Sequence, residues 1–321
     1  MEVSADIFLR ALAIMMVTYN HAHPYPTFTP GWGGGMTFLM MLSGYNFAKF
    51  GIQGASPADG RLALARLGGK ILIPSVVLVL FFFVILRKFD WAELFFYRNW
   101  ITVQRISKFP IWYPQVIIQM FGALLLLFSI PRVAAWIFRH PLPASLIIYS
   151  IALAVRAVFP QIWDTAPLRH QLPHLFLWNF TLGWVVYFCV TGIGGQRGKL
   201  LAVGAAVLGA SFGWGIHALD FWWLTIGVTL LVLPLNLRLY TPVARFFFIV
   251  SQATFAIFLL HRFVYEIYEH VPVPQNQDAE WLVGLLGSIG LWMAGVIPVR
   301  AYRAIARRNA NSSMRALMVQ R

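Results

Sequence analysis

Long apolar runs alternate with short polar or Gly/Pro-rich segments along the whole chain. Some of these runs, such as 71–86 and 200–212, contain no charged residue. Runs of roughly 20 apolar residues cross a bilayer as helices, because hydrocarbon offers no partner to unpaired backbone groups. The pattern predicts ten such segments, at 7–21, 36–50, 70–86, 116–130, 142–159, 172–190, 200–216, 221–235, 246–268 and 281–302.

Composition supports the same fold class. Hydrophobic residues make up 59% of the 321 residues and charged residues only 11%, whereas soluble domains carry about 25% charged residues. We therefore expect an all-α fold, a polytopic transmembrane helical bundle of about ten spans, with residues 1–302 as the transmembrane domain. The single cysteine, Cys189, excludes an intramolecular disulfide.

The net charge of +14 would suggest nucleic acid in a soluble protein. Here the basic residues lie between apolar runs, so we expect the lipid bilayer as a partner and no nucleic acid. Cytoplasmic loops are rich in Lys and Arg, and alternate gaps are basic in this chain. The residues concerned are Arg61, Arg66, Lys70, Arg132, Arg139, Arg197, Lys199, Arg238 and Arg245.

This alternation predicts that both termini are cytoplasmic and that residues 303–321 form a basic cytoplasmic tail near anionic headgroups. The third gap departs from the pattern. It contains Arg87, Lys88, Arg98, Arg105 and Lys108. Either this gap is a folded external loop, or the number of spans differs near residues 87–115.

The first apolar segment carries two polar residues on one face. Arg10 and His21 are eleven residues apart, which is almost three helical turns and roughly 16 Å along the axis. Placing Arg within a span costs at least ~2.5 kcal/mol, so such residues usually face the protein interior or a water-filled cavity. Alternatively, Arg10 pairs with Asp6 on the helix surface or extends to the headgroups, and His21 is an interfacial histidine.

A second histidine is expected at a similar depth. His261 lies about fifteen residues into the ninth segment, which runs outward in the predicted topology. It could share a site with His21, or it could be a packing histidine bonded to a backbone carbonyl. Four further side chains could line the same cavity or could serve packing and the interfacial belt. These are Tyr19, Asn20, Ser43 and Trp112.

The order of these motifs resembles the acyltransferase family 3 membrane proteins. The first segment is similar to the opening signature of that family, an acidic residue followed by Leu-Arg-Ala and a histidine eleven residues after the arginine. The residues that match are Asp6, Leu9-Arg10-Ala11 and His21. Further similar segments follow in family order, at Gly33–Tyr45, at Arg66 to Pro74, at Phe109–Tyr113 and at Ser251–His261.

Two positions depart from the family pattern. Gly68 interrupts the Arg-x-Arg motif that would follow Arg66. Ile117 and Ile118 stand where many members have a Glu-Glu pair. These glutamates therefore have no part in any chemistry of this chain, and a subfamily without them is implied.

The resemblance implies an O-acyltransferase of the bacterial inner membrane. Such an enzyme transfers an acyl group, usually acetyl, from acetyl-CoA or another acyl-CoA to a hydroxyl of a glycan or lipid-linked sugar. His21 is then the candidate general base, or a transient acyl carrier, and Arg10 the candidate donor-binding group. Arg61, Arg66 and Lys70 are expected either to hold the CoA phosphates or to be ordinary positive-inside residues.

Other functions are compatible with the same residues. Buried arginine and histidine also mark transport pathways, so a transporter or flippase is the main alternative. A non-catalytic subunit of a polysaccharide assembly complex is another. No metal-ligand spacing occurs, so no metal cofactor is expected. The sequence specifies neither the acceptor nor the acyl group. A homo-oligomer is compatible with it.

Overall fold

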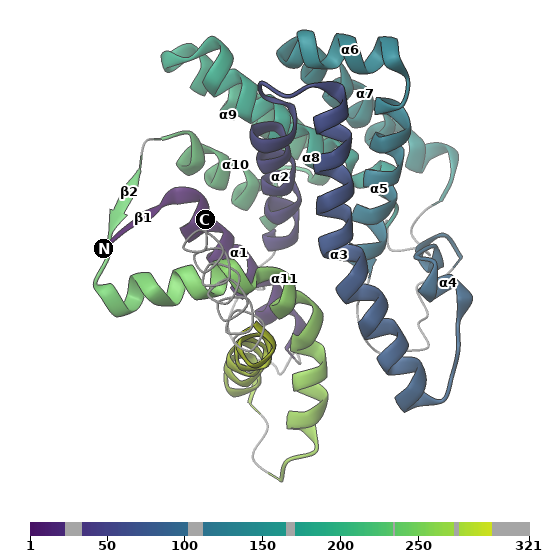
Figure 1. The fold of residues 1–321 in the computed structure, drawn as a ribbon. Coiled ribbons are helices and arrows are strands. Elements are labelled where there is room, and N and C mark those ends of the chain that lie inside the picture. Colours follow the sequence, from purple (N-terminus) through teal and green to yellow (C-terminus); the bar gives the residue numbers. More distant parts are fainter. Residues whose placement is uncertain (23–33, 102–111, 165–170, 234, 273–275, 297–321) are drawn as a thin grey trace, which may run out of the picture.

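The computed structural model describes residues 1–22, 34–101, 112–164, 171–233, 235–272 and 276–296. Most of these residues are helical (Figure 1), which confirms the predicted all-α fold class. Each of the ten predicted apolar segments overlaps a helix, although residues 297–302 of the last segment lie outside the described residues. These helices are α1 (Ala5–His21), α2 (Gly35–Phe47), α3 (Pro57–Leu86), α5 (Trp112–Phe128), α7 (Pro141–Ile162), α8 (Pro173–Phe188), α9 (Gly195–Trp214), α10 (Leu219–Val232), α11 (Thr241–Glu269) and the last described helix, Gln277–Val296.

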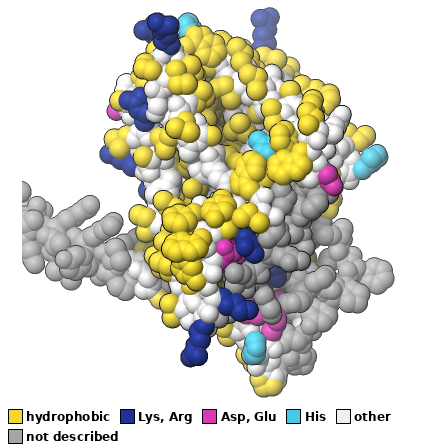
Figure 2. All heavy atoms as spheres, turned by 90° about the vertical axis from the view of Figure 1, so that its right-hand side faces the viewer, with side chains coloured by type: hydrophobic (Ala, Val, Ile, Leu, Met, Phe, Trp, Pro, Cys, Tyr) yellow, Lys and Arg dark blue, Asp and Glu magenta, His cyan; other side chains and the backbone are white. Residues whose placement is uncertain are grey.

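The chain has helices suited to a membrane. Among the described residues, five helices are long and apolar enough to cross a bilayer, and six if α5 and the short helix that follows it form one bent span. Hydrophobic side chains cover much of the face in Figure 2, and Lys and Arg lie toward its upper end and in its lower part. The number of ten spans stays a prediction. Helices α1, α2 and α10 are short, at 17, 13 and 14 residues, and α9, at 20 residues, is not among the helices apolar enough to cross.

Two of the α-helices, α2 and α8, end in a short π-helix. The π-helix η1 (Ala48–Ile52) continues α2, and the π-helix η4 (Cys189–Ile193) continues α8. Both extensions stay within the predicted apolar segments or reach just beyond them. The basic residues of the second gap are placed differently from the prediction: α3 begins at Pro57, so Arg61, Arg66 and Lys70 lie in a helix and not in a loop.

A two-stranded sheet ties the N-terminus to a distant segment, and the hydrophobic pattern did not predict it. Strand β1 (Glu2–Ser4) pairs antiparallel with β2 (Asn236–Arg238), with Val3 opposite Leu237. The N-terminal ammonium also donates to the carbonyl of Leu239 at 3.0 Å. The start of α1 is therefore held beside the segment that joins α10 to α11 (Figure 1).

The third gap contains a folded segment among its described residues, while its external position stays a prediction. Residues 87–101 include α4 (Trp91–Leu94) and the 3₁₀ helix η2 (Arg98–Trp100). Arg98 forms a 2.7 Å ion pair with Asp90. The side-chain amide of Gln119 in α5 donates to that of Asn99 at 2.8 Å and so holds the segment against the bundle. The remainder of the gap, 102–111, lies outside the described residues, as do Gly33 of the second motif and the tail 303–321.

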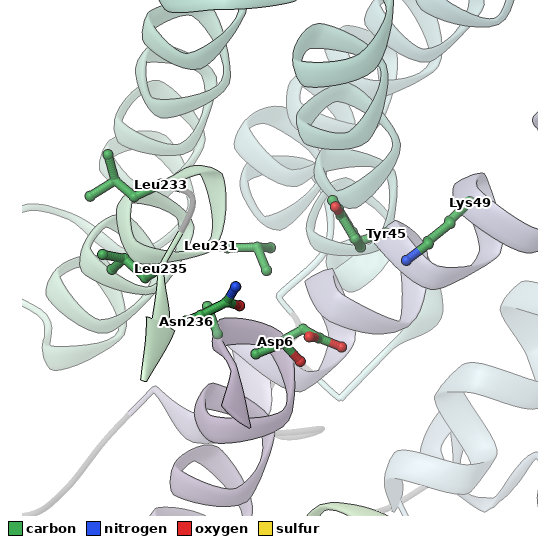
Figure 3. Close-up of a pocket in the computed structure, with 9 residues that line it drawn as sticks. Asp6, Tyr45, Lys49, Leu231, Leu233, Leu235 and Asn236 are labelled. Carbon is green, nitrogen blue, oxygen red and sulfur yellow. The ribbon is translucent and has the colours of Figure 1, made fainter. Parts of the chain in front are cut away.

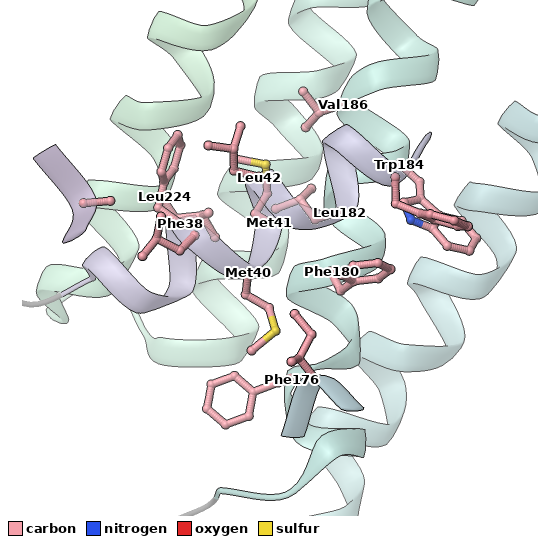
Figure 4. Close-up of a cluster of buried hydrophobic side chains, with 14 of the residues drawn as sticks. Phe38, Met40, Met41, Leu42, Phe176, Phe180, Leu182, Trp184, Val186 and Leu224 are labelled. Carbon is pink, nitrogen blue, oxygen red and sulfur yellow. The ribbon is translucent and has the colours of Figure 1, made fainter. Parts of the chain in front are cut away.

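The centre of the bundle is formed by α2 and α8. Large apolar side chains of both helices interleave (Figure 4), and α8 is buried along nearly its whole length. The backbones approach closely because glycines face each other. A Cβ at Gly44 would collide with the carbonyl of Phe180, and one at Gly183 with the backbone of Met41 and Tyr45. Small residues at helix contacts are typical of membrane bundles.

Candidate functional site

The two histidines expected at similar depth are in direct contact. His21 is the last residue of α1, and His261 lies in the second half of α11. Nδ1 of His21 is 2.9 Å from Nε2 of His261. The two rings are nearly parallel, at an interplanar angle of 8° and a centroid distance of 5.1 Å. His261 is completely buried, while His21 is partly exposed.

A backbone carbonyl fixes the tautomers of this pair. Nδ1 of His261 is 2.9 Å from the carbonyl oxygen of Ile257. A carbonyl can only accept, so Nδ1 of His261 carries the proton and its Nε2 is the acceptor in the neutral ring. Nδ1 of His21 must then donate to that acceptor. In neutral His21 this arrangement makes Nε2 the unprotonated nitrogen, the one that can take up a proton.

The last helix holds the end of α1 in place. The indole Nε1 of Trp281 donates to the carbonyl of Met15 and to Oγ1 of Thr18, both at 3.1 Å. Tyr19 packs edge-on against the same indole, and its hydroxyl donates to Oδ1 of Asp278 at 3.3 Å. Tyr19 therefore positions the helix end next to the histidines, whereas the neighbouring Asn20 is exposed.

Arg10 lies deeper in the same helix and faces the protein interior. Its guanidinium is within electrostatic range of Asp6 and of Tyr113, at the start of α5. Tyr113 is buried, and its hydroxyl lies within hydrogen-bonding reach of Ser43 in α2. The hydroxyl of Ser43 donates to the carbonyl of Leu39 at 2.8 Å. Three helices thus contribute to a polar cluster around Arg10.

Aromatic side chains connect this cluster to the histidine pair. The ring of Tyr113 packs on Phe258 at 5.1 Å between centroids, and Phe258 packs on His261 at 6.1 Å. Trp112 contacts Tyr113 and Phe176. Tyr113 and Phe258 were not predicted as site residues. Their position next to Trp112 and within the Ser251–His261 motif was the only sequence signal for them.

A pocket of about 230 Å³ opens near the N-terminal end of α1, on the far side of Arg10 from His21. Asp6, Tyr45 and Lys49 present polar groups to it, and Leu231 and Asn236 contribute from the opposite wall (Figure 3). Asp6 is one helical turn from Arg10. The pocket therefore ends one turn away from the polar cluster around Arg10.

The three basic residues of α3 do not converge on this pocket. Nη1 of Arg61 donates to the carbonyl of Phe128 at 3.0 Å and so caps the end of α5. Arg66 and Lys70 are exposed, one turn apart, on the stripe of α3 that also carries the exposed Ile73 and Val77. Long basic side chains on such a stripe reach the headgroups. This placement favours the positive-inside interpretation over a shared phosphate site.

No group of three His, Cys, Asp or Glu side chains with the spacing of a metal site occurs among the described residues. Comparison of the chain with models of known protein families, with curated proteins and with solved structures gives no match.

Proposed function

We propose that the protein is a membrane-embedded O-acyltransferase that moves an acyl group, usually acetyl, from acyl-CoA to a hydroxyl of a glycan or lipid-linked sugar. The observation that carries this proposal is the 2.9 Å contact between His21 and His261, with the tautomer set by Ile257. It supports His21 as a general base because the nitrogen left unprotonated is Nε2, on the partly exposed ring. The order of family-like motifs supplies the reaction class.

The reaction follows from these groups. The acceptor hydroxyl oxygen attacks the thioester carbonyl carbon while Nε2 of His21 removes the hydroxyl proton. The C–S bond breaks, and the proton passes from Nε2 to the departing thiolate, so that the products are an ester and CoA-SH. His21 is cationic in between, and its Nδ1–H continues to donate to Nε2 of His261. His261 is a positioning residue that keeps the ring of His21 in one orientation.

Arg10 is proposed to bind an anionic or carbonyl group of the acyl donor, because a planar guanidinium recognises such groups with paired hydrogen bonds. The pocket at Asp6, Tyr45 and Lys49 offers the donor an approach from the basic end of the bundle. In the proposed topology the chain makes about ten spans of a bacterial inner membrane, with both termini cytoplasmic. The donor then approaches from the cytoplasm, and His21 lies near the opposite surface.

A single assay tests the proposal. Purified protein in detergent is given radiolabelled acetyl-CoA with candidate glycan acceptors, and both CoA release and acceptor labelling are measured. We expect acceptor-dependent release that His21→Ala abolishes while helix content by circular dichroism is unchanged. Full turnover in that variant would exclude the proposed base. If no acyl-CoA is consumed with any acceptor, the transporter or flippase alternative is favoured.

A further inference from the structure

A short basic helix lies at the end of the bundle and has no part in the proposed reaction. Helix α6 (Pro131–Arg139) follows α5 after a bend of 99°. In Figure 1 it lies across the upper end of the molecule. Ala134 and Ile137 are buried on its inner face, at 0% and 2% exposure. Its other face is open to the surroundings.

The open face combines positive charge with an indole. Arg132, Trp136 and Arg139 are spaced by four and three residues, so they project from one side of the helix. With Ala135 and His140 they line a shallow pocket of about 410 Å³. Both arginines are exposed, and Trp136 is 39% exposed. Within the described part of the chain, neither arginine has an acidic or hydrogen-bonding side-chain partner.

Apolar surface continues from this pocket along the neighbouring helices. Leu126, in the last turn of α5, and Ile130, which directly precedes α6, are 73% and 50% exposed. Leu146 and Ile147, in the first turns of α7, are 41% and 50% exposed. Side chains of this kind on long apolar helices suit contact with acyl chains. The basic pocket therefore lies where lipid headgroups would meet two lipid-facing helices.

We infer that the outer face of α6 binds the phosphate of an anionic membrane lipid. Arg132 and Arg139 contact the phosphate oxygens, since guanidinium groups pair with phosphate through two parallel hydrogen bonds. Trp136 lies at headgroup level, where indoles are enriched. The N-terminal end of α7, which begins directly after His140, is oriented with its positive dipole toward the same place.

Native mass spectrometry of the full-length protein tests this assignment. The protein is purified in a neutral detergent and titrated with phosphatidylglycerol or with phosphatidylcholine of the same chains. We expect retention of phosphatidylglycerol in preference to phosphatidylcholine. Arg132→Ala with Arg139→Ala should weaken the phosphatidylglycerol complex about tenfold or more. The matched control is Arg197→Ala with Lys199→Ala, which removes two positive charges at the start of α9, on the same end of the bundle. This control should retain most of the affinity for phosphatidylglycerol.

Three outcomes would overturn the inference. One is equal retention of the two lipids. Another is an equal loss of affinity in both double variants, which would show only a general charge effect. In the third, excess adenosine 3′,5′-bisphosphate displaces the lipid, and binding of this nucleotide requires Arg132 and Arg139. The site would then bind a soluble phosphate compound and not a lipid. Melting temperature and circular dichroism verify that each variant is folded.

Discussion

Tyr265 donates its hydroxyl to the backbone carbonyl of Thr18 at 2.8 Å, less than one turn before His21. The tyrosine is 1% exposed, so this bond is shielded from competing water. Trp281 also donates to Thr18 and to Met15, so α11 and the last described helix together fix the position of α1 along its axis. The His21–His261 contact is therefore built into helix packing and needs no ligand to form it.

His21→Gln should lower acyl transfer by about 100- to 10,000-fold, the range that general bases contribute. Glutamine retains an amide donor toward His261 but cannot accept a proton at neutral pH. The measurement is CoA release with a thiol reagent at saturating donor. His270→Gln is the matched control, because His270 is exposed and its Nδ1 contacts a carbonyl of its own helix, that of Glu266. Equal rates in the two variants would contradict the proposed role.

The tautomers can be observed directly. Both His21 and His261 should carry their proton on Nδ1, although the neutral side chain of free histidine in water favours Nε2. ¹⁵N spectra of histidine-labelled protein in detergent at mildly alkaline pH should show this pattern for two rings. His261→Ala should change the pattern of His21, because its Nδ1 loses the acceptor. A spectrum with Nε2–H at both rings would rule out the hydrogen-bond chain to Ile257.

Tyr113→Phe should raise the KM for the acyl donor about three- to tenfold, the range of one net hydrogen bond, with a smaller change in kcat. The phenyl ring keeps the packing on Phe258, while the hydroxyl near Arg10 and Ser43 is lost. Initial rates over a range of acetyl-CoA concentrations separate the two constants. Tyr97→Phe, in the folded segment 87–101, serves as control. A loss confined to kcat would place Tyr113 with the histidines instead of the donor.

Gly44→Ala should destabilise the protein, and Gly122→Ala should not. The added methyl of Gly44→Ala meets the Phe180 backbone, so α2 and α8 must separate. Gly122 lies within α5 with no atom within 4 Å of the added carbon, and alanine there favours the helix by up to about 1 kcal/mol. Thermal unfolding in one detergent compares the two. A higher melting temperature for Gly44→Ala would show that the helices are not closely packed there.

The helices could be predicted from sequence because apolar length is a local property of the chain. Helix α6 and the strands β1 and β2 could not be predicted, each for a different physical reason. Helix α6 has only nine residues, too few for an apolar run. Strands β1 and β2 have three residues each and depend on pairing between residues that are 232 or more positions apart. Helix α3 begins at Pro57, before the apolar run starts at Lys70, so hydropathy alone placed residues 57–69 in a loop.

The candidate site could be predicted in part. Helical spacing placed Arg10 and His21 on one face, and the predicted topology placed His261 at a similar depth. The contact of the two rings, and the roles of Tyr113, Phe258 and Trp281, depend on how four helices pack. Side-chain packing of this kind leaves no periodic signal in one sequence. Arg61, Arg66 and Lys70 are close in sequence and yet do not form one cluster in α3, so proximity along the chain alone does not predict a shared site.

The strand pair at the N-terminus also bears on the order of synthesis. Residues 2–4 can pair only after residues 236–238 have left the ribosome, and His21 meets its partner only after His261 has been made. The first helix to be synthesised is therefore among the last to reach its final neighbours. Until α11 has been made, the proposed base His21 lacks its partner His261. The proposed site is therefore incomplete until α11 has been synthesised.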